Sequence, residues 1–207
     1  MMKLYTSVVA FILIALSTPA FSQDDNDANS TTQELELYHS PSKSRKIVLT
    51  GYEIVVDVPK DSRPKYYGET AYKGNKVQAY NDFWKKDITK EVQEKIKSDI
   101  DSLRNDNAAV RDKKMVISSD IQVFYPDVKG FIWGKSFAKV RIHFVVKSDL
   151  KVFIDKDFEE SFVTSGDDEE FKAVSKTETI EESANITIGI ALRMVLDKLY
   201  GEMNMIY

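Results

Sequence analysis

The stretch SFAKVRIHFVVK, residues 136–147, alternates apolar and polar side chains strictly from Ala138 to Phe144. In an extended strand its apolar members lie on one face: Val140, Ile142, Phe144 and Val146. The charged members lie on the other face: Lys139, Arg141, His143 and Lys147. A strand with one apolar and one polar face is typical of an antiparallel sheet that is covered on one side and solvated on the other. We therefore expect the fold to be organised around such a sheet.

Three further stretches predict strands, at residues 46–58, 114–125 and 152–166. The first places Tyr52, Ile54, Val56 and Val58 on one face. The segment 69–80 predicts an optional short hairpin with Gly74 and Asn75 at its tip. These strands can supply the neighbours that the alternating strand needs.

Two segments predict helices. In the first, Asp87 is placed to cap a helix in which Ile88, Val92, Ile96, Ile100 and Leu103 recur at helical spacing. Polar residues fill its other faces, so we expect only one side to be buried. The second follows a capping-box pattern at residues 175–178 and is apolar on more than one face. Gly189 lies within it and indicates close packing, which we expect to be against the sheet.

The order of elements is strand, optional hairpin, helix, three strands and helix. This order predicts an α+β fold of two layers: a mainly antiparallel four-stranded sheet with two helices packed on one face. Residues 44–207 are expected to form this single domain.

The N-terminus resembles a secretory signal. Lys3 precedes an apolar stretch at residues 8–17, and Ala20-Phe21-Ser22 fits a small-x-small cleavage pattern. The apolar stretch is shorter than the roughly 20 residues that a membrane-spanning helix needs. We expect residues 1–22 to be a signal peptide cleaved after Ser22, residues 23–43 to be a flexible polar spacer, and the protein to be periplasmic or secreted.

Composition excludes several kinds of chemistry. The 207-residue chain has a formal net charge of −4, no cysteine and two histidines. It therefore has no global attraction to nucleic acid, no thiolate chemistry, and too few histidines for the common catalytic zinc sites. Phosphate loops, nucleophile elbows and paired-histidine motifs are absent from the sequence. We expect no enzyme activity, no catalytic residue, no metal site and no cofactor.

Asp155 and Asp157 are spaced to share one face of a strand. A calcium site would require further oxygen ligands at a recognisable spacing, and none follows in the sequence. We therefore interpret the two aspartates as part of a solvated strand face. His143, which lies on a charged strand face, is interpreted as a surface residue rather than a ligand.

An apolar turn is the strongest candidate for a binding site. Between two strands, residues 127–136 place Phe131, Ile132 and Trp133 together between two glycines. Turns are normally polar, so an apolar tip indicates contact with a partner, a lipid surface or a second subunit. The alternative is that the tip folds back onto the aromatic-rich segment 66–84.

That segment suggests a second hypothesis. Tyr72, Tyr80 and Trp84 lie within it and could bind a small molecule, a lipid or a glycan. The first hypothesis remains a non-enzymatic module that binds an envelope protein or associates with itself. Neither hypothesis requires nucleic acid or a membrane span after the signal is removed, and both permit peripheral contact with the envelope.

The run from SSDIQVFYPDVKG through KVRIHFVVKS and DFEESFVTSG to KTETIEESANITIGIALRMVLDKLYGEM resembles the YajG-like family of uncharacterised bacterial envelope lipoproteins. Upstream, VVDVPKDSRP, with Asp61 and Arg63, is similar to the first strand and following turn of that family. The resemblance covers roughly residues 45–203 and implies an envelope-facing α+β domain without assigned catalysis. The chain lacks the cysteine that a lipoprotein signal requires, so we expect no lipid anchor.

Overall fold

The computed structural model describes residues 36–47, 51–63, 66–67, 77–78, 87–104, 112–129, 135–149, 151–163 and 180–206. All of these belong to one compact unit, Gln33–Tyr207. Its longer elements are β1 (Tyr52–Val56), α1 (Ile88–Leu103), β5 (Lys113–Lys129), β6 (Lys135–Ser148), β7 (Lys151–Val163) and α3 (Ile180–Met203). Two-residue strands lie between β1 and α1: β2 (Lys60–Asp61), β3 (Tyr66–Tyr67) and β4 (Val77–Gln78).

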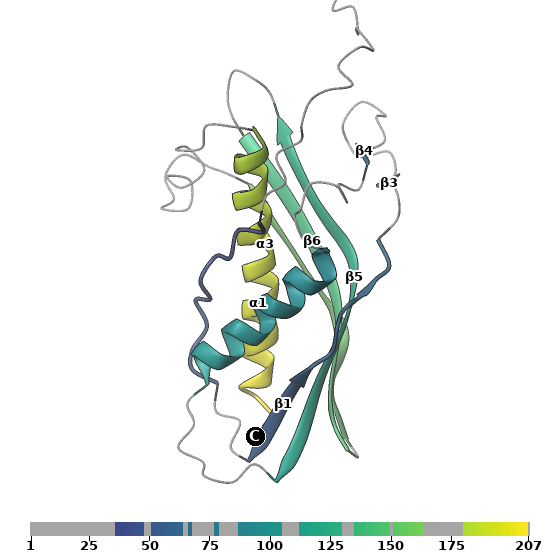
Figure 1. Ribbon diagram of the computed structural model, residues 1–207, viewed down its shortest axis with the longest axis vertical. Helices are drawn as coiled ribbons and strands as arrows, with labels where there is room; N and C mark the ends of the chain where they lie inside the picture. Colours follow the sequence, from purple (N-terminus) through teal and green to yellow (C-terminus); the bar gives the residue numbers. More distant parts are fainter. Residues whose placement is uncertain are drawn as a thin grey trace, which may run out of the picture. The chain divides into compact units, whose positions relative to one another are not determined.

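The main sheet has the strand order β1-β5-β6-β7, and the short β2 also pairs with β5. β1 and β2 run parallel to β5, whereas β5, β6 and β7 are successively antiparallel. In Figure 1, α3 lies along this sheet and α1 crosses α3 obliquely. The predicted α+β class, with two helices over one face of a mainly antiparallel sheet, is confirmed.

The alternation predicted for β6 is also confirmed. Val140, Ile142, Phe144 and Val146 are fully buried beneath the helices, while the intervening side chains face away. Apolar residues of α1, α3, β5 and β7 join them in one core. The helices therefore cover one face of the sheet and leave the other uncovered by any described helix.

Strand boundaries differ from expectation in two places. β1 ends at Val56, so Val58, predicted to belong to the same strand face, lies beyond the strand and is 58% exposed. β5, predicted to stop before Pro126, continues to Lys129. Pro126 lies beyond Ile121, the last β5 residue that pairs with β2. Its backbone nitrogen, which has no hydrogen to donate, points to the side of β5 where no described strand pairs, so proline is tolerated there.

The optional hairpin is present as an antiparallel pairing of β3 with β4. Its first strand begins at Tyr66, before the predicted segment, and the predicted tip at Gly74 and Asn75 lies outside the described residues. The capping-box residues 175–178 also lie outside them, and α3 is described from Ile180 onward.

Asp87 caps α1 as predicted. Its carboxylate accepts a hydrogen bond from the Thr89 amide at 2.8 Å and another from the Thr89 hydroxyl at 2.5 Å. These hydrogen bonds lower the pKa of the Asp87 carboxyl below its ordinary value. The ionised carboxylate is therefore the form that stabilises the first turn.

Replacing this cap gives a pH-dependent prediction. Asp87→Ala should lower the free energy of unfolding by about 1 kcal/mol at neutral pH. Because the folded-state pKa is lowered, the effect is complete above the unfolded pKa of about 3.9 and is lost as pH falls through the folded value. Urea denaturation across this range measures it. Asp101→Ala, an exposed change on the same helix, should stay within about 0.5 kcal/mol; an equal loss there would contradict a capping role.

α1 is more buried than its sequence indicates. Besides its apolar stripe, Glu91, Lys95 and Asp99 are each at most 5% exposed. Lys95 Nζ pairs with Asp99 Oδ1, and the Tyr200 hydroxyl of α3 donates to Asp99 Oδ2 at 3.1 Å. Burial, followed by the Asp99 charge, raises the pKa of Tyr200 well above its usual value and keeps it a donor. The expectation of one buried side is confirmed, but that side also carries charged residues, one of which joins α1 to α3.

Residues 36–47, the N-terminal strap, pack along α3 (Figure 1, purple). The Asn185 side chain accepts from the Tyr38 amide at 3.0 Å and donates to the Glu36 carbonyl at 2.8 Å. Asp197 accepts from the Ser42 and Ser44 hydroxyls at 2.5 and 2.9 Å. The boundary placed at residue 44 is therefore too late, since residues 36–43 of the expected flexible spacer belong to the domain.

Gly189 lies between these two polar anchors. A Cβ atom added to it would lie 2.1 Å from the Tyr38 carbonyl oxygen, far inside contact distance. The close packing predicted at Gly189 exists, but its partner is the strap and not the sheet. Asn185, Gly189 and Asp197 are spaced by multiples of four residues, so they lie on one stripe of α3 and this stripe contacts the strap.

Candidate functional site

The six residues predicted to bind a partner lie outside the described residues. They are Phe131, Ile132, Trp133, Tyr72, Tyr80 and Trp84. The structure does define the base of the turn that carries the first three. β5 and β6 remain paired to Lys129 and Lys135, the residues that bound it. β7 ends at Val163, opposite Phe137, so the two-stranded ribbon extends beyond the described end of β7.

A small apolar cluster lies at the base of this ribbon. Tyr125 is 6% exposed, and Val123 and Phe137 pack against it, apart from the main core. A β-bulge between Ile121 and Val123 shifts the register. Beyond the bulge Phe124 remains in the core, so Val123 and Tyr125 face the side without helices. The uncovered face of the sheet is therefore apolar near the ribbon.

Farther along, the same face is charged. Lys139 Nζ lies 2.7 Å from Glu159 Oε1, and Arg141 pairs with the other oxygen of that carboxylate. Burial alone would raise the pKa of Glu159, but hydrogen bonds from Lys139 and Arg141 outweigh it and lower the pKa. Glu159 is therefore held ionised between β6 and β7.

His143 lies between two carboxylates on this face. Its Nδ1 is 2.8 Å from Asp157 Oδ1 and its Nε2 is 3.0 Å from Asp155 Oδ1. The prediction that Asp155 and Asp157 share a strand face is confirmed. Both ring nitrogens therefore face carboxylate oxygens of β7. Within the described ranges, no group of three or more His, Asp or Glu side chains is placed to hold a metal ion.

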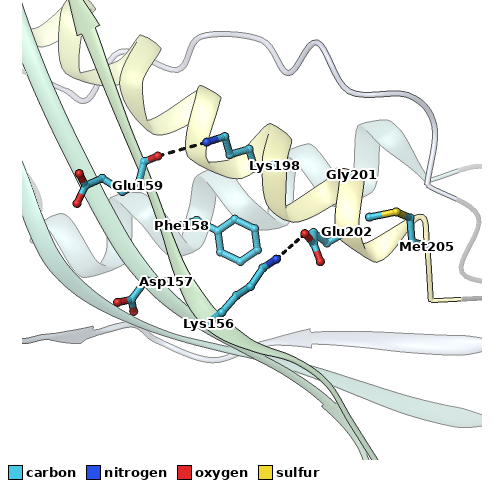
Figure 2. Close-up of a pocket in the computed structure, with 8 residues that line it drawn as sticks. All are labelled: Lys156, Asp157, Phe158, Glu159, Lys198, Gly201, Glu202 and Met205. Carbon is cyan, nitrogen blue, oxygen red and sulfur yellow. Dashed lines mark hydrogen bonds and ion pairs between the residues drawn. The ribbon is translucent and has the colours of Figure 1, made fainter.

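A groove of about 430 Å³ lies between β7 and the end of α3 (Figure 2). Its lining residues are Lys156, Asp157, Phe158, Glu159, Lys198, Gly201, Glu202 and Met205. The Phe158 ring lies between an ion pair and a hydrogen bond. The ion pair joins Lys156 Nζ to Glu202 Oε1 at 2.5 Å, and the hydrogen bond runs from Lys198 Nζ to the Glu159 carbonyl oxygen at 3.4 Å. The groove therefore has polar groups on either side of an apolar floor formed by Phe158.

Sequence reasoning missed this groove because its two sides are distant in the chain. One signal was available: Lys156 and Glu160 fall on the same strand face as the buried Ile154, Phe158 and Phe162. Charged residues on the inward face are typical of an edge strand. Lys156 and Glu160 in fact pair with Glu202 and Lys198 of α3.

The fold and surface define a two-layer α+β domain with an uncovered sheet face and an open groove at one edge. Among the described residues, no helix is sufficiently long and apolar to cross a membrane. No protein-family model matches the sequence, and neither does any curated protein.

A solved structure shows the same fold. Protein XCC0632 from Xanthomonas campestris, described under the family model DUF330, superposes with a TM-score of 0.53 at 12% identity, covering 83% of this chain and 95% of that one. The hypothetical protein CT253 from Chlamydia trachomatis gives a TM-score of 0.38 at 10% identity, covering 74% of this chain and 98% of that one. At these identities the likeness to XCC0632 shows the fold alone.

Proposed function

We propose that this protein is an exported, non-enzymatic interaction domain that binds an envelope protein through the apolar turn at residues 130–134. The observation that carries the proposal is the β5–β6 ribbon, which remains paired to Lys129 and Lys135 and extends past the described end of β7. We expect a turn at the end of such a ribbon to lie beyond the four-stranded part of the sheet.

The residue types in the turn support a contact role. Phe131, Ile132 and Trp133 are consecutive. Tryptophan is enriched among the residues whose truncation costs most binding free energy. The Tyr125 cluster fixes the base of the ribbon, so little backbone entropy should be lost on binding. A rigid base and an apolar tip together favour protein recognition.

Export and the absence of catalysis are parts of the same proposal. The signal-like N-terminus favours a periplasmic or secreted location, without a lipid anchor because the sequence has no cysteine. The YajG-like resemblance favours the same compartment. On the uncovered sheet face, the side chains of Glu159, Asp155, Asp157 and His143 contact one another or neighbouring charged side chains across β6 and β7.

The two tryptophans of the chain provide a matched test. Trp133 lies in the apolar turn and Trp84 in the aromatic-rich segment proposed for a small molecule, lipid or glycan. Trp133→Ala should lower recovery of a cross-linked envelope partner about tenfold, the effect of losing a contact of roughly 1.4 kcal/mol. Trp84→Ala should leave that recovery unchanged. Both variants should melt within a few degrees of the wild type.

The outcomes separate the two hypotheses. A large loss of stability for Trp133→Ala, with partner recovery following the folded fraction, would show that the tip packs within the protein. A thermal shift with glycans or lipids that Trp84→Ala abolishes would instead support the small-molecule hypothesis, because a ligand stabilises the fold that binds it.

A further inference from the structure

The two edges of the main sheet differ in how their outward backbone groups are satisfied. On β1, the carbonyl oxygen of Val56 accepts from Gln93 Nε2 at 2.8 Å, and that of Tyr52 accepts from the Arg104 guanidinium. On β7, the one described contact to an outward carbonyl is from Lys198 to Glu159, at 3.4 Å. Within the described parts of the chain, β6 is the single strand that pairs with β7. The β7 edge is therefore the open one.

The hydrogen-bond pattern identifies which β7 groups face outward. The carbonyl oxygens of Ile117 and Ile121 in β5 accept from the amides of Asp57 and Ser62. Backbone groups alternate sides along a strand, so the even-numbered residues of β5, before its bulge, face β6. The residue pairs between β5 and β6 show that odd-numbered β6 residues face β5, so even-numbered ones face β7. The pairs between β6 and β7 then place the N–H and C=O groups of odd-numbered β7 residues, from Asp155 to Val163, on the outer edge.

An acidic row lies beside this edge. Asp155, Asp157 and Glu159 are odd-numbered, and their side chains are 61%, 50% and 36% exposed on the uncovered face. Their described ion-pair partners all belong to β6. Antiparallel pairing of β7 with a second copy about a two-fold axis would set acidic rows against each other, which is unfavourable. The charge is complementary instead to a basic strand.

The groove of Figure 2 adjoins the same edge on the helix side. Phe158 is buried at its base, and Met205 is 70% exposed. Apart from the neighbouring backbone of α3, no described atom lies within 4 Å of the position that a Gly201 Cβ would occupy, so this part of the groove is open. Side chains on the other face of an added strand can enter here and contact Phe158 and Met205.

We propose that the outer edge of β7 binds an extended segment of a protein partner by strand addition. The segment carries basic residues at alternate positions, facing Asp155, Asp157 and Glu159, and apolar residues between them that enter the groove. Main-chain hydrogen bonds supply affinity and the alternate side chains supply specificity. Lys156 and Glu160, inward-facing and paired with α3, discourage indiscriminate pairing with other strands.

The probe is a capped peptide of alternating lysine and valine, compared with the same peptide carrying glutamate for lysine. Fluorescence anisotropy with the purified protein should show the lysine peptide binding at least tenfold more tightly, and the difference should shrink as salt is raised. Hydrogen exchange should slow at the outward amides of Asp157, Glu159 and Ser161. Equal binding of both peptides, or no protection in β7, would overturn the proposal.

Two variants test the edge. Ser161→Pro removes an outward N–H without removing a bond to β6, and Ser161→Ala is its control. Asp157→Lys reverses one charge of the acidic row, and Glu53→Lys makes the same kind of change on β1 at the opposite edge. We expect Ser161→Pro and Asp157→Lys to weaken peptide binding at least tenfold and both controls to leave it unchanged.

Circular dichroism establishes whether each variant folds. If Ser161→Pro does not fold, the comparison of peptide binding between Asp157→Lys and Glu53→Lys tests the site on β7. Binding that survives both test variants, or that falls equally with Glu53→Lys, would contradict a site on β7. A protein dimer in sedimentation that Ser161→Pro dissociates would replace the basic partner with a second copy of the chain.

Discussion

Lys95→Ala is expected to lower the free energy of unfolding by about 3 to 5 kcal/mol. Lys95 and Asp99 are both almost fully buried, at 3% and 5% exposure, and pair across one turn of α1. Removing the ammonium leaves the Asp99 carboxylate with the Tyr200 hydroxyl as its described partner. A buried charge without its counter-charge is costly, whereas the intact pair contributes little net stability. Urea denaturation at neutral pH measures the loss.

Two controls separate the ion pair from general effects of the substitution. Lys97→Ala changes an exposed lysine on the same helix and should stay within about 0.5 kcal/mol of the wild type. The triple variant Lys95→Met, Asp99→Leu, Tyr200→Phe removes every member of the network and should recover most of the lost stability. A loss below about 1 kcal/mol for Lys95→Ala would show that water reaches Asp99.

This network marks a limit of sequence interpretation. An i, i+4 lysine–aspartate pair on a helix is the pattern of a solvated face, and nothing local distinguishes it from a buried pair. The burial of Glu91 could not be predicted from α1 alone either. Glu91 is buried, and its Oε2 lies 3.4 Å from Nε2 of His39 in the strap. These charged residues of α1 are buried because α3 and the strap pack against them. The residue pattern within α1 contains no information about that packing.

Where local periodicity does determine the structure, prediction succeeded. The alternation in β6 requires one buried face, and Asp87 has the side chain that a helix start needs, so both were predicted from a few adjacent residues. The strap could not be found in this way. It carries few large apolar residues, and its polar contacts with α3 join residues about 150 positions apart in sequence, 147 in the case of Tyr38 and Asn185.

The candidate surfaces were predicted unevenly for the same reason. The shared face of Asp155 and Asp157 follows from strand periodicity, whereas their contact with His143 depends on the register between β6 and β7. The groove beside β7 depends on where α3 ends over the sheet. Inward-facing charges at Lys156 and Glu160 were the local sign that β7 is an edge strand.

Gly189→Ala is expected to destabilise the protein by about 1 to 3 kcal/mol, although alanine is the better helix former. The added methyl group would lie 2.1 Å from the Tyr38 carbonyl oxygen and 3.0 Å from its carbon, so the strap backbone must move. That movement weakens both hydrogen bonds between Asn185 and the strap. Urea denaturation gives the stability, and hydrogen exchange at the Tyr38 amide reports the strap directly.

Gly201→Ala is the matched control, because it makes the same change in the same helix where, apart from the neighbouring backbone of that helix, no described atom lies within 4 Å of the new methyl group. It should leave stability unchanged or raise it by up to about 1 kcal/mol, the difference in helix propensity. The two substitutions should therefore have opposite signs. If Gly189→Ala were also neutral or stabilising, with unchanged exchange at Tyr38, the strap would not be held against α3 at that position, and its assignment to the domain would be wrong.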